Sequence, residues 1–144
     1  MLNKIITAIS QALDDAFNVN SDDYAIYTEN VEQGLNEPCF FIFSLEPSNK
    51  QLIRNRYERT YPFDIHYFPK SEDRNNEINE ITETLFDVLE YVNLDDGPIK
   101  GTNMHGEIID NVLHFFINFN MIVAKDIQKE DSMENLKVEG NLKG

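Results

Sequence analysis

The longest regular pattern of apolar and polar positions lies between Tyr57 and Phe68. Odd positions there are aromatic or aliphatic, apart from Arg59, and even positions are mostly polar. A period of two predicts a strand with one buried face. At about 3.3 Å per residue the strand would span roughly 40 Å, more than a typical strand. We therefore expect it to project beyond the domain or to break, and Pro62 marks where a break could fall. Because proline has no N–H, we expect Pro62 at a bulge or where that side of the strand is unpaired.

Two other stretches, residues 2–17 and 74–92, show the three- and four-residue spacing of amphipathic helices. Apolar and alternating segments predict strands at 24–28, 39–45, 56–68, 99–109 and 112–124, and residues 47–49 are predicted as a turn. Together these elements predict an α+β fold, a single antiparallel or mixed sheet with two helices packed on one face, in the order α-β-β-β-α-β-β. Because the strands carry more aromatic side chains than two helices can cover, we expect another subunit to bury some of them.

The pattern stops near the end of the chain. Residues 1–125 are predicted to form one α+β domain, which is long enough to bury a core. Residues 126–144 are polar and are predicted to form a tail that is flexible or ordered on a partner.

Composition narrows the class of protein. The chain is 41% hydrophobic and contains one cysteine, so it cannot form an internal disulfide. No apolar run approaches the ~20 residues that a membrane helix needs, and the first residues do not have the pattern of a signal peptide. These features predict a protein made in the cytoplasm with no membrane partner.

The charge of the chain is strongly negative but unevenly distributed. The formal net charge is −14, yet residues 51–70 carry four basic and two acidic side chains, whereas residues 71–96 carry one basic and nine acidic ones. This balance argues against sequence-specific nucleic-acid binding. Guanidinium groups pair well with carboxylates, so the basic segment is a candidate contact with the acidic helix of a neighbouring copy or with another partner. The candidate interface residues are Arg54, Arg56, Tyr57 and Arg59.

No motif in the sequence indicates catalysis. It contains no nucleophile elbow, phosphate-binding loop or metalloprotease motif, and the carboxylates of the second helix follow its outer face. Cys39, His66, His105 and His114 are too irregularly spaced for a metal site, and His66 and His114 are expected on solvent-facing strand positions. We therefore predict no catalytic residues, no cofactor, no metal site and no enzymatic activity. A metal-dependent hydrolase would require these side chains to converge.

Several segments together resemble a known family. They are Pro38-Cys39-Phe40-Phe41-Ile42, Asn55-Arg56-Tyr57, Tyr61-Pro62-Phe63-Asp64-Ile65-His66-Tyr67-Phe68, Gly101-Thr102-Asn103-Met104-His105 and Leu113-His114-Phe115-Phe116. They resemble small phage tail terminator proteins over about residues 1–125. The resemblance implies a structural protein that forms a hexameric ring on the end of the tail tube, stops tail growth and offers a surface to the head or neck. It implies no catalytic residues.

The resemblance also implies where and with what the protein works. Its partners would be other copies of itself and the tail tube protein, and it also allows tail sheath and neck or head-completion proteins. The isolated protein could be a monomer that forms rings only on the tube. Assembly would take place in the host cytoplasm, and the protein would then belong to the tail of a virion or a tail-like particle. Two alternatives stay open: a neck or head-completion protein, and a small regulatory or ligand-binding α+β module.

Overall fold

A computed structural model describes residues 1–28 and 34–126 of the chain. Most of the polar segment predicted as a tail, 127–144, lies outside the described residues. The described elements are α1 (Leu2–Phe17), β1 (Ala25–Tyr27), β2 (Cys39–Ser44), β3 (Ser48–Gln51), β4 (Arg56–Phe68), α2 (Arg74–Val88), β5 (Tyr91–Leu94), β6 (Gly97–Ile109) and β7 (Val112–Ala124). The predicted α+β class is confirmed.

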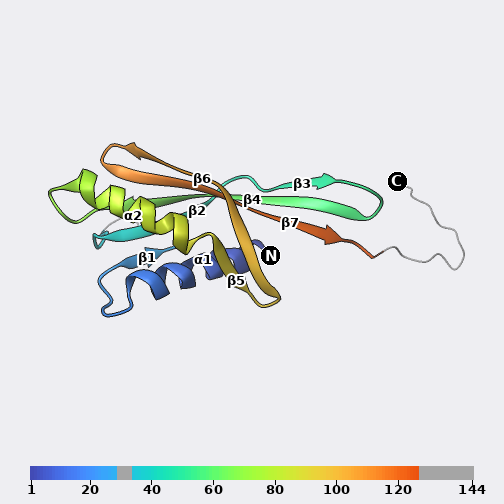
Figure 1. Ribbon diagram of the computed structural model, residues 1–144, viewed down its shortest axis with the longest axis horizontal. Helices are drawn as coiled ribbons and strands as arrows, with labels where there is room; N and C mark the ends of the chain where they lie inside the picture. Colours follow the sequence, from blue (N-terminus) through green and yellow to red (C-terminus); the bar gives the residue numbers. More distant parts are fainter. Residues whose placement is uncertain (29–33, 127–144) are drawn as a thin grey trace, which may run out of the picture.

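The strands form one mixed sheet with β4 near its middle (Figure 1). The order across the sheet is β1-β2-β4-β7-β6-β5, and β3 also pairs with β4. The β1–β2 pair is parallel and the others are antiparallel. Alternate residues of β4 and β7, such as Phe63 and Phe115, are fully buried in one core with the apolar stripes of both helices. The core therefore occupies one face of the sheet, and we call the other the open face.

The long strand β4 does not break but projects, as one of the two alternatives predicted. Figure 1 shows β3, the start of β4 and the end of β7 extending away from both helices, and we call residues 48–60 and 120–124 the arm. The amide of Leu45 donates to the carbonyl of Pro62 at 2.9 Å, between the end of β2 and the start of β3. The missing N–H of Pro62 thus falls where that side of β4 has no strand partner, which is one of the two positions predicted for it.

Two sequence predictions were wrong. Residues 47–49 were predicted as a turn, but β3 occupies 48–51 because it pairs through its backbone while all four side chains stay exposed. The second helix was predicted to reach residue 92, but it ends at Val88 and β5 follows. Leu89 and Val92 are both buried, so burial continues while the backbone changes from helix to strand.

The strand β6 changes partner along its length. Its first four residues pair with β5 and the later ones with β7. The register skips one residue between Thr102 and His105, where Asn103 has a positive φ of 52°. Gly101 lies just before this bulge, packed against the carbonyl of Leu89 and the side chain of Ile117, with no room for a Cβ atom. The bend lets the β5–β6 hairpin pack near α1.

Glu77 fixes the connection between β4 and α2. One carboxylate oxygen accepts hydrogen bonds from the Tyr67 hydroxyl and the Lys70 amide, and the other accepts one from the Ser71 amide. Partial burial raises the pKa of Glu77, but these hydrogen bonds outweigh it and hold the pKa below its ordinary value. The acidic side chain is therefore retained in its charged form at the start of the helix.

Candidate functional site

The four residues predicted as an interface all lie on the arm. Arg54 occupies the turn between β3 and β4 with a positive φ of 58°, and the other three lie in the first four residues of β4. The Nζ atom of Lys125 lies 4.5 Å from the centre of the Tyr57 ring, and Arg59 donates through Nε to the Asn49 side chain at 3.0 Å. Strand pairing thus gathers basic and aromatic groups on a segment that extends away from both described helices (Figure 1).

Within the described part of their own subunit, the arginines of the arm have no acidic partner. Among residues 1–28 and 34–126, the ion pairs are Lys4 with Asp95 and the contacts of Asp64 with two histidines. The acidic helix α2 lies toward the other end of the sheet (Figure 1). The basic arm and the acidic helix are therefore separated within one molecule, an arrangement in which each can meet a different neighbour.

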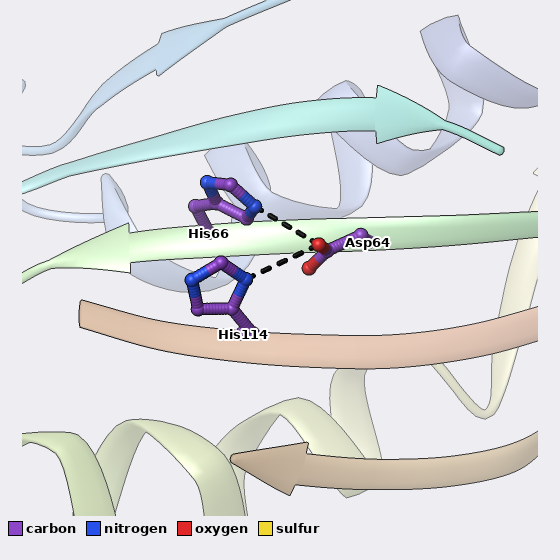
Figure 2. A network of polar contacts seen from close by, with 3 residues as sticks. All are labelled: Asp64, His66 and His114. Atoms are coloured by element: carbon purple, nitrogen blue, oxygen red, sulfur yellow. Dashed lines mark hydrogen bonds and ion pairs between the residues drawn. The ribbon is translucent and has the colours of Figure 1, made fainter. Parts of the chain in front are cut away.

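A second group of polar side chains, which sequence reasoning missed, lies on the open face. Asp64 and His66 are two residues apart on β4, so they point to the same side. His114 on β7 is the direct cross-strand partner of His66. We call these three residues the histidine–aspartate cluster (Figure 2). The signal was present in the sequence, since both histidines occupy even positions of long alternating strands, but the strand register was needed to bring them together.

The carboxylate of Asp64 holds the cluster together. Its Oδ2 atom lies 3.0 Å from Nε2 of His66 and 3.2 Å from Nδ1 of His114, as Figure 2 shows. The side chains are 14%, 20% and 19% exposed for Asp64, His66 and His114, so they are much less open to solvent than the sequence predicted. Burial lowers the pKa of His66, and the hydrogen bond with Asp64 opposes this shift only in part. The neutral imidazole is thus favoured.

Aromatic rings surround the cluster. The Phe43 ring lies 4.5 Å from that of His66, and the two imidazole rings are 4.0 Å apart. The third histidine, His105, instead stacks on Phe116 at 4.9 Å. Burial raises the pKa of the Cys39 thiol to about 11, which keeps it protonated and unreactive. Of the four histidine and cysteine side chains considered above, the structure therefore brings only two together, and it adds Asp64.

Comparison with protein families identifies the chain. The family model described as "Phage tail terminator protein" matches residues 4–131. The chain belongs to the phage tail terminator family. The match spans both helices and every described strand, so the resemblance seen in the short motifs extends over the whole fold. Membership assigns the terminator a structural role in phage tail assembly, in association with other tail components and as part of the tail.

Two other comparisons add little. No curated protein sequence matches the terminator. One solved structure is 8% identical with a TM-score of 0.44, and the alignment covers 90% of this chain and 99% of that one. The assignment to the family therefore depends on the sequence match.

The family is that of a structural phage tail protein and is not a known enzyme class. In residues 1–28 and 34–126, no helix is both long enough and apolar enough to cross a membrane.

Proposed function

We propose that this terminator closes into a ring of six copies on the end of the tail tube, ends tail growth there and presents a surface to the head, neck or collar. The family match supports the role in tails, and the number six follows from the resemblance to ring-forming terminators. The structural observation that carries the proposal is the projecting arm, whose arginines have no acidic partner among the described residues of their own subunit.

Two unlike surfaces on one subunit suit a head-to-tail ring. Such an interface joins different patches of neighbouring copies. It forms a closed ring when the rotations between successive copies add up to one full turn. We propose that the arm, through Arg54, Arg56, Tyr57 and Arg59, contacts the neighbouring subunit or the tube, and that the acidic face of α2 receives it in the neighbour. Exposed ion pairs contribute only about 0–1 kcal/mol each, so they act mainly on orientation.

Apolar side chains on the arm supply a second source of affinity. Leu52 and Ile53 at its tip and Ile122 on β7 are exposed in the single subunit. Burying apolar surface stabilises an interface by roughly 25 cal/mol per Å² before the costs of association. We therefore propose that these side chains become buried in the assembled ring.

Charge reversal on the arm tests this function. Changing Arg54, Arg56 and Arg59 together to glutamate should leave the subunit folded but give tails of uncontrolled length, because the arm would repel its acidic partner. Tail lengths would be measured by electron microscopy of particles made with each variant. The matched control changes three exposed basic residues outside both the arm and α2, Lys4, Lys70 and Lys100, to glutamate and should give tails of normal length. Normal tails from the arm variant would exclude these arginines from termination.

The alternative of a neck or head-completion protein predicts different binding. Purified wild-type protein should bind the ends of isolated tail tubes, whereas a neck protein would bind a portal or connector and leave tube ends unoccupied. We further propose that assembly occurs in the host cytoplasm, that the protein has no catalytic activity and that it binds no specific nucleic-acid sequence.

A further inference from the structure

We propose that Asp64, His66 and His114 bind one Zn²⁺ ion per subunit on the open face of the sheet. This site goes beyond tail termination and does not depend on it. It also departs from the expectation based on residue spacing, because that expectation considered positions along the chain and not pairing between β4 and β7.

The backbone places the three ligands before any metal arrives. Asp64 and His66 project from the same side of one strand, and His114 projects from the position opposite His66 on the next. Both strands lie inside the sheet, between β2 and β6. Their Cα positions are therefore held by hydrogen bonds on both sides, so little ordering is needed on binding.

The distances fit a zinc ion after small side-chain movements. Oδ2 of Asp64 lies 3.0 Å and 3.2 Å from the facing nitrogens of the two histidines, and one ligand atom from each residue lies within 4.8 Å of the others. Zinc–nitrogen and zinc–oxygen bonds of about 2.0–2.2 Å in a tetrahedron separate the ligand atoms by roughly 3.3–3.6 Å. Side-chain rotation that widens the two contacts by a few tenths of an ångström would admit the ion.

An unsatisfied oxygen in the cluster also favours a cation. The second carboxylate oxygen of Asp64, Oδ1, is buried and has no hydrogen-bond partner among the described residues. A buried polar oxygen without a partner is costly, and a cation bound to the carboxylate would offset that cost. Metal binding requires both imidazoles in their neutral form.

The ligand set selects a transition metal over Mg²⁺ or Ca²⁺. Two imidazole nitrogens and one carboxylate suit zinc, whereas magnesium and calcium prefer oxygen ligands. Three protein ligands leave a fourth tetrahedral position, which water can fill because both imidazoles remain about one-fifth exposed.

Zinc titration of the full-length protein tests the proposal. The wild-type protein, without a histidine tag and after dialysis against a chelator, should bind zinc with a stoichiometry of one per subunit in isothermal titration calorimetry. Binding to the folded state alone should raise its melting temperature, with about a 100-fold rise in the folded-to-unfolded ratio when free zinc is 100 times the Kd.

Glutamine variants show whether the cluster holds the ion. His66→Gln and His114→Gln should each weaken zinc binding at least about 100-fold, since loss of a partner outside the ligand shell already costs 10–100-fold. Circular dichroism would show that they stay folded. His105→Gln is the matched control, because His105 lies on the same sheet but outside the cluster, and it should bind like the wild type.

Two results would overturn the proposal. One is the absence of saturable zinc binding to wild-type protein, which would leave the cluster as a hydrogen-bonded group of side chains. The other is zinc binding that persists unchanged in the folded His66→Gln, His114→Gln double variant, which would place the ion elsewhere. Neither result bears on tail length, so the proposal stands or falls separately from termination.

Discussion

At the scale of single residues, Glu77 shows how one carboxylate can join two elements. Its two oxygens accept from a buried tyrosine hydroxyl and from two backbone amides before α2. Charge-assisted hydrogen bonds of this kind are stronger than neutral ones. The end of β4 and the start of α2 are therefore held together by one side chain.

We predict that Glu77→Gln lowers the free energy of unfolding by about 1 kcal/mol at neutral pH, because the amide keeps one acceptor but turns a donor toward the Ser71 amide. The pKa of Glu77 lies below its ordinary value of 4.5 in the folded protein. Its contribution is therefore present above about pH 4.5 and lost as the pH falls through the folded pKa. The difference from wild type should shrink in acid.

Urea unfolding from pH 7 to pH 3 would measure both effects. Glu80→Gln is the control, since Glu80 lies on the exposed face of the same helix, and it should change stability by less than about 0.5 kcal/mol. A difference that grew as the pH fell would contradict this role of Glu77.

At the scale of elements, the sequence predicted most of the fold. Helix α1 and the strands β4 and β7 have the predicted bounds, because each has a long, regular alternation between a buried and an exposed side. β3 was missed because its exposed side chains carry no such alternation. β5 was missed because Leu89 and Val92 continue the helical spacing of buried residues beyond the end of α2.

The two candidate sites also differ in how far the sequence alone could predict them. The arm residues were predicted from charges that are adjacent in the sequence, and they lie together because they belong to one turn and one strand. The histidine–aspartate cluster joins residues 50 positions apart. Only the register between β4 and β7 brings them together, and that register depends on the whole sheet.

At the scale of elements, our prediction concerns Gly101, which lies just before the bulge that bends β6. A Cβ atom at Gly101 would collide with the Leu89 carbonyl and lie 2.5 Å from Cδ1 of Ile117. Because the carbonyl belongs to the backbone and cannot rotate away, Gly101→Ala should destabilise the protein by about 2–3 kcal/mol. Thermal or urea unfolding would measure the loss.

Gly106 in the same strand provides the comparison. There an added Cβ would lie 3.2 Å from a Leu113 methyl group and 3.3 Å from one of Thr82, both on side chains that can move. Gly106→Ala should therefore cost less than about 1 kcal/mol. Equal losses in the two variants would show that the close approach at Gly101 does not limit the bend.

At the scale of the whole molecule, the separation of charge is the main feature. In the proposed ring, the basic arm of a subunit contacts one neighbour and its acidic helix contacts the other. Each subunit therefore takes part in two contacts and supplies a different surface to each. This arrangement makes the pairing testable by exchanging the charges.

We predict that assembly lost by the triple arginine-to-glutamate variant of the arm is restored when Glu80, Glu83 and Asp87 on α2 are changed to lysine in the same chain. All three are exposed, so the subunit should stay folded. The lysine changes alone should impair tail termination as the arm changes do, since both leave like charges facing across the contact. Tail lengths from the three variants would measure this, and failure of the combination to restore normal lengths would show that the arm meets another surface.

The central position of β4 has a consequence for how the protein is made. One edge of β4 pairs with β2 and β3, which precede it, but the other pairs with β7, the last described strand. While the ribosome is still making residues 69–111, that second edge has no partner. Unpaired edges of apolar strands template contacts with other chains. The sheet therefore closes only after residues 112–124 have been made, and a chain released early would carry an unpaired strand edge.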